Sequence, residues 1–177
     1  MLTPGGQVVP NEEIRDNLSR LSNFLAKLPF PYTITSGYRS PSFNASIGGA
    51  PGSQHTNGLA VDIVPFGIRN WMLGAWIYYH QWAFPEIDEV ITYTDEPHLH
   101  IGICPRNATG CGAGAPNQQF LRSTRGEYVP WVPNPADLPY DILNIDPRVP
   151  KSWAPTVVPI VISAALIYGA WKWRQSR

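Results

Sequence analysis

The sequence is poor in charged residues and in cysteine, and each shortage argues against a class of protein. Charged residues make up 15% of the 177, against about 25% in a typical soluble domain. Lysine plus arginine and aspartate plus glutamate number 13 each, so the formal net charge is zero. A balanced chain without a basic run is a poor match for nucleic-acid phosphates, and we expect no nucleic-acid partner. Two cysteines are too few for a disulfide-dense small protein or a four-cysteine zinc module.

Proline, by contrast, is abundant and unevenly placed. The 19 prolines are roughly 11% of the chain, about twice the usual share of ~5%. Many fall in residues 104–153, which are therefore predicted to form neither a continuous helix nor a central strand. We expect an extended proline-rich arm that packs partly against the domain or a partner. Cys104 and Cys111 in this arm either close a small disulfide ring or are two unrelated free thiols.

Residues 1–103 show helix and strand patterns in alternation. Asn11 is a favourable helix cap, and the two glutamates that follow face the positive end of the helix dipole. One apolar face then recurs at helical spacing, at Ile14, Leu18, Leu21, Leu25 and Leu28. A second helix is predicted over 70–81, and strands over 32–35, 58–64, 89–93 and 98–103. The predicted fold class is α+β, a small antiparallel sheet with flanking helices.

The longest apolar run lies near the end of the sequence. Residues 152–171 contain no charge, and about 20 helical residues span about 30 Å, the thickness of a bilayer's hydrocarbon core. Aromatic side chains lie at both ends of the run, where interfacial aromatics belong. We therefore expect one C-terminal transmembrane helix over 154–173, with the lipid bilayer as a partner. The alternative is a buried apolar helix of the domain.

These patterns divide the chain into four predicted parts. They are a compact domain at 1–103, the proline-rich arm at 104–153, the transmembrane helix at 154–173 and a short basic tail at 174–177. The first residues have neither the basic region nor the apolar region of a secretory signal peptide, so we expect none.

Two segments carry residues suited to metal chemistry. His55 ends a glycine-rich loop, Asp62 lies on the following predicted strand, and His98 and His100 lie two residues apart on another. Imidazole and carboxylate are good zinc ligands, and three of them leave the fourth position open, as in catalytic zinc sites. Because residues two apart on a strand share a face, one of His98 and His100 can bind metal while the other stands beside it.

These residues resemble a known family. Ser53, His55, Gly58, Ala60 and Asp62 match every defined position of the motif S-x-H-x-x-G-x-A-x-D, followed by the H-x-H of residues 98–100. Residues 36–40 read S-G-Y-R-S, which is also similar to a segment of that family. The combination, over residues 32–103, resembles the zinc peptidase group of D-Ala-D-Ala carboxypeptidases, L-Ala-D-Glu endopeptidases of phage endolysins and the hedgehog signalling domain. It implies a hedgehog/DD-peptidase-like fold.

The resemblance also implies roles for single residues. The Zn²⁺ ligands would be His55, Asp62 and His100. His98 would be a catalytic residue that handles the proton or stabilises the transition state, and Arg39 would be a catalytic and substrate-binding group that holds a carboxylate or carbonyl. Some members place a glutamate base three residues before the last ligand, where this chain has Pro97.

Two assignments within the resemblance have alternatives. Because Pro97 replaces the glutamate, we prefer His98 as the base, and Glu96 is the alternative base because alternation places it on the same face. Ser53 is either a substrate-binding residue or a loop-capping hydroxyl.

The leading functional hypothesis is a zinc-dependent peptidase that cuts peptide bonds in peptidoglycan stem peptides, of carboxypeptidase or endopeptidase type. The alternative is a non-catalytic, membrane-anchored zinc-binding module with a structural or binding role. With the expected anchor and no signal peptide, we favour a phage virion membrane protein with virion partners, whose catalytic domain faces the cell wall. A bacterial envelope enzyme is the other possibility for its location.

Overall fold

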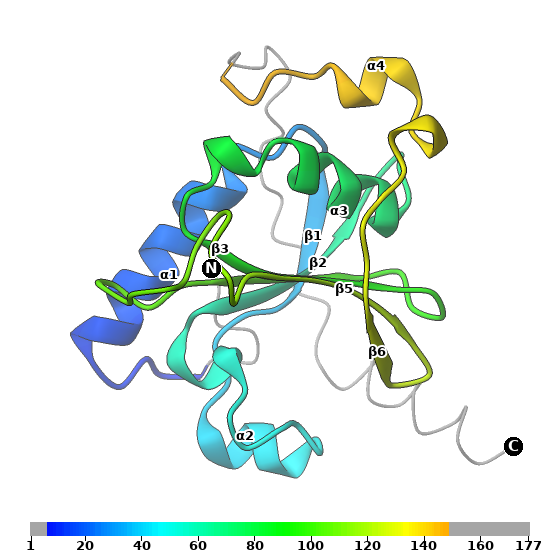
Figure 1. The fold of residues 1–177 in the computed structure, drawn as a ribbon. Helices are drawn as coiled ribbons and strands as arrows, with labels where there is room; N and C mark the ends of the chain where they lie inside the picture. The colour runs from blue at the N-terminus through cyan, green and yellow to red at the C-terminus, as the bar shows by residue number, and fades with distance from the viewer. Residues whose placement is uncertain (1–6, 149–177) are drawn as a thin grey trace, which may run out of the picture.

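A computed structural model of the chain describes residues 7–148 and shows an α+β fold around one six-stranded sheet (Figure 1). The strands follow the spatial order β1-β2-β4-β3-β5-β6. Their bounds are β1 Tyr32–Ser36, β2 Ala60–Pro65, β3 Ile87–Tyr93, β4 Leu99–Ile103, β5 Gln119–Thr124 and β6 Glu127–Pro130. The α-helices are α1 Glu12–Leu25, α2 Pro41–Ser46, α3 Asn70–Tyr79 and α4 Tyr140–Leu143, and the 3-10 turns are η2 Gln54–Asn57, η3 Gln81–Ala83 and η4 Pro135–Asp137.

The first helix begins as its sequence predicts. The Asn11 side chain accepts a hydrogen bond from the Ile14 amide at 2.9 Å, which satisfies one of the unpaired donors of the first turn. The predicted apolar face is buried, and the helix ends before Pro29. The glycine-rich segment that ends at His55 is preceded by a short helix, α2, which the sequence patterns did not predict.

The sheet is mixed, so the prediction of an antiparallel sheet is correct for only part of it. Strands β1, β2, β4 and β3 pair antiparallel, but β5 pairs parallel to β3. Strand β6 then returns antiparallel to β5 as a hairpin. Strand β5 follows β4 in the sequence but lies on the other side of β3, so residues 104–118 carry the chain past β3.

The expectation that residues 104–153 contain no central strand is wrong at β5. This strand lies between β3 and β6, and its residues 119–124 contain no proline, so every amide there can join a ladder. Pro116 precedes β5, and Pro130 ends β6. These prolines lie at the two ends of the hairpin and do not prevent its formation. The boundary between domain and arm at residue 103 stays a prediction.

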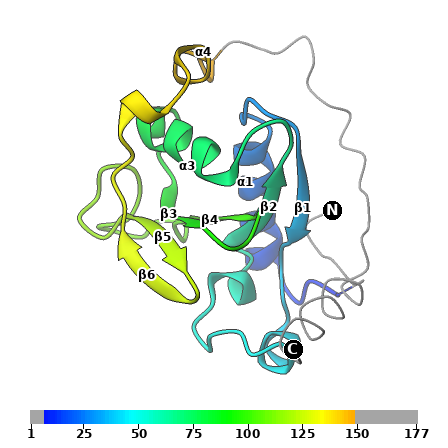
Figure 2. The ribbon, with the colours of Figure 1, turned by 90° about the vertical axis from the view of Figure 1, so that its right-hand side faces the viewer.

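The two faces of the sheet differ. One packs against the hydrophobic core, and the other carries the candidate site residues. Helices α1 and α3 lie on the same side of the strands (Figure 2), and the buried cluster joins their apolar side chains to alternate strand residues such as Val61, Ile63, Leu99 and Ile101. Because side chains alternate along a strand, Asp62 and His100 point to the opposite face.

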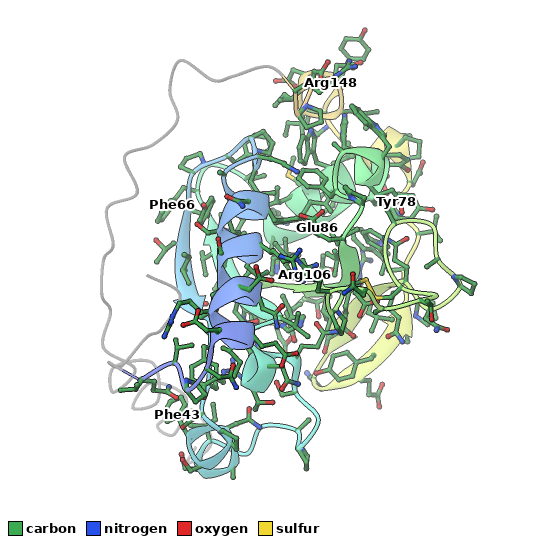
Figure 3. The ribbon with its side chains drawn as sticks, turned by 90° about the vertical axis from the view of Figure 1, so that its left-hand side faces the viewer. Phe43, Phe66, Tyr78, Glu86, Arg106 and Arg148 are labelled. Carbon is green, nitrogen blue, oxygen red and sulfur yellow. A yellow bond between two sulfur atoms is a disulfide. The ribbon has the colours of Figure 1, made fainter. Side chains whose placement is uncertain are left out.

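The segment after β4 is attached to the domain by several contacts. Cys104 and Cys111 form a disulfide, so the ring alternative is the one observed. Arg106, labelled in Figure 3, lies beside α1. It makes a bidentate ion pair with Asp16 of that helix, with its Nε and Nη2 at 3.0 and 2.7 Å from Asp16 Oδ2. Farther along, Trp76 of α3 donates to the Ile145 carbonyl at 3.0 Å, and the Tyr79 hydroxyl donates to the Pro133 carbonyl.

Within residues 7–148, no helix is long and apolar enough to cross a membrane. The predicted transmembrane helix at 154–173 and the basic tail at 174–177 lie outside the described residues.

Candidate metal centre and catalytic cleft

Three separate elements bring the predicted metal ligands together. His55 lies on η2, Asp62 on β2 and His100 on β4, and all three are buried. Asp62 and His100 are direct cross-strand partners, so the β2–β4 register alone places them side by side. One ligand atom from each residue lies within 4.8 Å of the others.

Neighbouring oxygens fix the orientation of both imidazoles. Nδ1 of His55 lies 2.8 Å from the Gly37 carbonyl, which leaves its Nε2 facing Asp62 Oδ1 at 3.2 Å. Nδ1 of His100 lies 2.8 Å from the same Asp62 oxygen, and its Nε2 lies 3.2 Å from Glu89 Oε2. Each ring therefore has one nitrogen at the centre and one held by a second partner, the usual arrangement around histidine metal ligands.

The three residues of this cluster shift one another's pKa values. Burial would raise the pKa of Asp62, but His55 and His100 outweigh it and hold that pKa well below its ordinary value. Burial lowers the pKa of His55. Burial would also lower the pKa of His100, but hydrogen bonds with Asp62 and Glu89 raise it to about 9. At pH 7 Asp62 is therefore a carboxylate and His55 is neutral, which are states that ligate metals, whereas His100 is protonated and must release a proton to ligate an ion.

The donor set fits zinc. Two imidazoles and one carboxylate are ligands that Zn²⁺ accepts, and three protein ligands are typical of a catalytic site with one open position. The inward nitrogens and Asp62 Oδ1 already face one another, and the outward nitrogens are held by Gly37 and Glu89. The side chains thus meet the requirement for a zinc site without rearrangement of the strands.

Arg39 lies beside the predicted ligands, and its guanidinium is engaged with one of them. Its Nη2 donates to Asp62 Oδ2 at 2.7 Å, its Nε donates to Ser36 Oγ at 2.8 Å, and its backbone amide donates to the His55 carbonyl at 3.1 Å. The contact with Oδ2 leaves Oδ1 of Asp62 to the two histidines. Its catalytic and substrate-binding roles remain predictions.

His98 and Glu96 lie next to each other at the mouth of the site. Nδ1 of His98 is 3.1 Å from Glu96 Oε2, and the His98 ring packs against Tyr93 with centroids 4.1 Å apart. Nδ2 of Asn70 at the start of α3 lies within 3.0 Å of the carbonyls of Tyr93, Glu96 and His98. This one buried amide therefore holds the whole β3–β4 turn that carries both candidate bases.

A cavity of about 620 Å³ opens over the three ligands. Arg39, Ser53, Glu96 and His98 line it together with His55, Asp62 and His100, so every predicted site residue borders one space. Ser53 precedes η2, but its hydroxyl makes no capping hydrogen bond there, which leaves the substrate-binding role as its remaining prediction. The rest of the lining consists of Gly48, Gly49, Ala50, Gly52, Gln54, Glu89, Ile91, Tyr93 and Tyr128.

The cleft residues that sequence reasoning missed include Glu89, Tyr93 and Tyr128. Glu89 and Tyr93 lie on the same face of β3, because side chains alternate along a strand. This alternation could be seen in the sequence, but it points to the site only once β3 is known to pair with β4. Tyr128 had no such signal because its segment was expected to be an extended proline-rich arm, and the structure makes it the edge strand β6.

Comparison with known proteins identifies the family. Residues 4–102 match the family described as Peptidase M15, which is more than half of the chain and includes all predicted site residues. The chain belongs to the peptidase M15 family. It is thus a member of a metallopeptidase family whose enzymes are typically zinc-dependent, and the resemblance stated from the motifs is confirmed. No curated protein and no solved structure matched this chain.

Proposed function

We propose that this M15 peptidase is a zinc enzyme that hydrolyses peptide bonds in the stem peptides of peptidoglycan. The observation that carries the proposal is a single cleft with His55, Asp62 and His100 at its base and a non-ligand histidine, His98, at its mouth. Membership of the family supports the substrate class at the level of peptidoglycan-derived peptides.

Each residue of the cleft has its own role in the proposed reaction. A zinc ion held by His55, Asp62 and His100 would polarise the scissile carbonyl and lower the pKa of the attacking water. His98 is the group that takes and returns the proton, because its Nδ1 is held by Glu96 and its ring is held by Tyr93. Arg39, already at the rim beside Asp62, supplies a permanent positive charge for a substrate carbonyl or carboxylate.

The preference for His98 over Glu96 as the base rests on their environments. The His98 side chain is 20% exposed and lies between Tyr93 and Glu96, whereas the Glu96 side chain is 50% exposed. A half-exposed carboxylate is well placed to orient the imidazole and stabilise its charged form, as the acid partner of a catalytic histidine does.

The proposal extends to location. The uncharged run at 152–171 supports a C-terminal membrane anchor, and the proline-rich segment before it would set the reach of the catalytic domain. We favour a phage virion membrane protein whose catalytic domain meets the host wall, with a bacterial envelope enzyme as the alternative.

One experiment tests the activity directly. Full-length protein in mild detergent is incubated with purified peptidoglycan, and the released fragments are identified by mass spectrometry. We expect stem-peptide cleavage that stops after chelation and returns with zinc. The mass of the products assigns the bond and separates the carboxypeptidase type from the endopeptidase type. Intact peptidoglycan in the presence of stoichiometric zinc would contradict the proposal and favour a non-catalytic zinc-binding module.

A further inference from the structure

The cleft contains one aromatic side chain that comes from outside the matched M15 residues. Tyr128 lies on β6, beyond the end of the match at residue 102, and it lines the same cavity as His55, Asp62 and His100. Figures 1 and 2 both show the β5–β6 hairpin at the same end of the molecule as α2, away from α4. The hairpin thus adds a wall to a site whose metal ligands it does not provide.

Tyr128 is a neighbour of Tyr93, whose ring packs against the candidate base. The Tyr93 ring packs against His98, and burial followed by the neighbouring Tyr128 raises the pKa of Tyr93, so its phenol stays protonated. The Tyr128 side chain is 54% exposed and is therefore not a core residue of the hairpin. A large exposed ring beside a polar site suits contact with a ligand more than stabilisation of the fold.

Much of the remaining wall brings little side-chain surface. Gly48, Gly49, Ala50 and Gly52 line the cavity, and a Cβ added at Gly48 or Gly52 would meet no atom within 4 Å. This wall offers backbone groups and open space to a substrate. Apolar contact with a substrate chain must therefore come mainly from the tyrosines.

We propose that Tyr128 is a substrate-positioning residue, which packs its ring against the stem-peptide chain while the scissile bond lies over the metal centre. The inference rests on the proposed function, since it names the residue that holds the substrate of that reaction. It also assigns the hairpin a role: β6 supplies binding surface from beyond the matched M15 residues, and β5 joins β6 to the rest of the sheet.

The test compares Tyr128→Ala with wild type on a soluble stem peptide that the wild type cleaves. We expect KM to rise roughly tenfold in the variant, the loss of one aromatic contact, while kcat changes less than about twofold. Zinc content and melting temperature stay at wild-type values, because the ring neither ligates the metal nor fills the core. Tyr128→Phe separates ring from hydroxyl, and we expect it to keep most of the affinity.

Tyr140→Ala is the matched control. Tyr140 is 82% exposed on α4 and does not line the cavity, so its loss should leave KM unchanged. Peptide binding to zinc-loaded His98→Ala, with and without Tyr128→Ala, gives a second readout that does not depend on turnover. Unchanged KM and unchanged binding on loss of Tyr128 would overturn this inference and leave the proposed function intact. A wild type that cleaves no stem peptide would overturn both.

Discussion

The metal centre depends on which nitrogen each histidine turns toward Asp62. The Gly37 carbonyl holds one side of the His55 ring and Glu89 holds one side of the His100 ring, so the nitrogens that face Asp62 are set by neighbours that ligate nothing themselves. A pre-oriented ligand set needs little rearrangement to bind an ion. The three ligand side chains should therefore matter more to metal content than any other residues of the cleft.

Replacement of His55, Asp62 or His100 by alanine should each remove the metal. We expect about one zinc per wild-type chain by atomic absorption and well below that in all three variants, because two remaining ligands bind weakly. Melting temperatures should also fall, since an ion that binds only the folded state stabilises it. Near-stoichiometric zinc in the three variants would show that the ligands are elsewhere.

His98→Ala should separate catalysis from metal binding. Because His98 borders the cavity but is not one of the three clustered ligands, the variant should retain zinc and lose ~10²-fold or more in kcat, as for a general acid or base. Glu96→Gln is the comparison, and it should lose less because the amide can still hydrogen-bond Nδ1. A fully active His98→Ala beside an inactive Glu96→Gln would make Glu96 the base.

At the scale of elements, the β3–β4 turn is the part of the fold most directly tied to chemistry. It carries Glu96 and His98, and its carbonyls converge on the Asn70 amide at the first turn of α3. The helix therefore does more than cover the core face of the sheet. Its first residue fixes the turn on which both candidate bases lie.

Asn70→Ala should loosen this turn. We expect unfolding to become easier by about 1–3 kcal/mol, the usual cost when buried polar groups lose a hydrogen-bond partner. Urea denaturation measures this cost, and kcat should fall while zinc content stays normal because no ligand lies on the turn. Asn144→Ala is the control, since that side chain bonds an exposed carbonyl within α4. Wild-type stability and kcat in Asn70→Ala would show that the turn keeps its conformation without the Asn70 hydrogen bonds.

At the scale of the whole molecule, every predicted site residue lies between residues 39 and 100, and the hairpin closes the cleft from beyond them. The ligand residues, both candidate bases and Tyr128 all lie within residues 7–148, the described part of the chain. The proposed anchor lies after this part. Catalysis and attachment are therefore expected to be separable by truncation.

Truncation after Pro150 should release an active enzyme that needs no detergent, while the full-length protein should stay with membranes in alkaline carbonate. The physical reason is that about 20 apolar residues with internally bonded backbone are sufficient to span a bilayer. Membrane fractionation checks where each form of the protein is found, and the peptidoglycan assay checks whether the truncated form is active. Carbonate-extractable full-length protein would contradict the anchor, and an unfolded truncation would show that the last residues belong to the core.

Local patterns in the sequence were sufficient for the individual elements. The Asn11 cap, the apolar face of α1 and the alternation of β2 and β4 are short-range signals, and they predicted α1 and these strands to within a few residues. His98, predicted on the strand, lies just before β4, but it borders the same cavity as His100. The motif around His55 and Asp62 was enough to identify the family, because its residue types and spacing are local properties of the chain.

Only the tertiary structure decided which of these elements meet. The register of β2 against β4 places Asp62 opposite His100, and the pairing of β3 with β4 brings Glu89 to the second nitrogen of that ring. The parallel pairing of β5 with β3 was not predictable from the prolines around β5. This pairing positions β6, which brings Tyr128 to the cleft. Strand order and register depend on contacts between residues far apart in the chain, where long-range packing outweighs any local pattern.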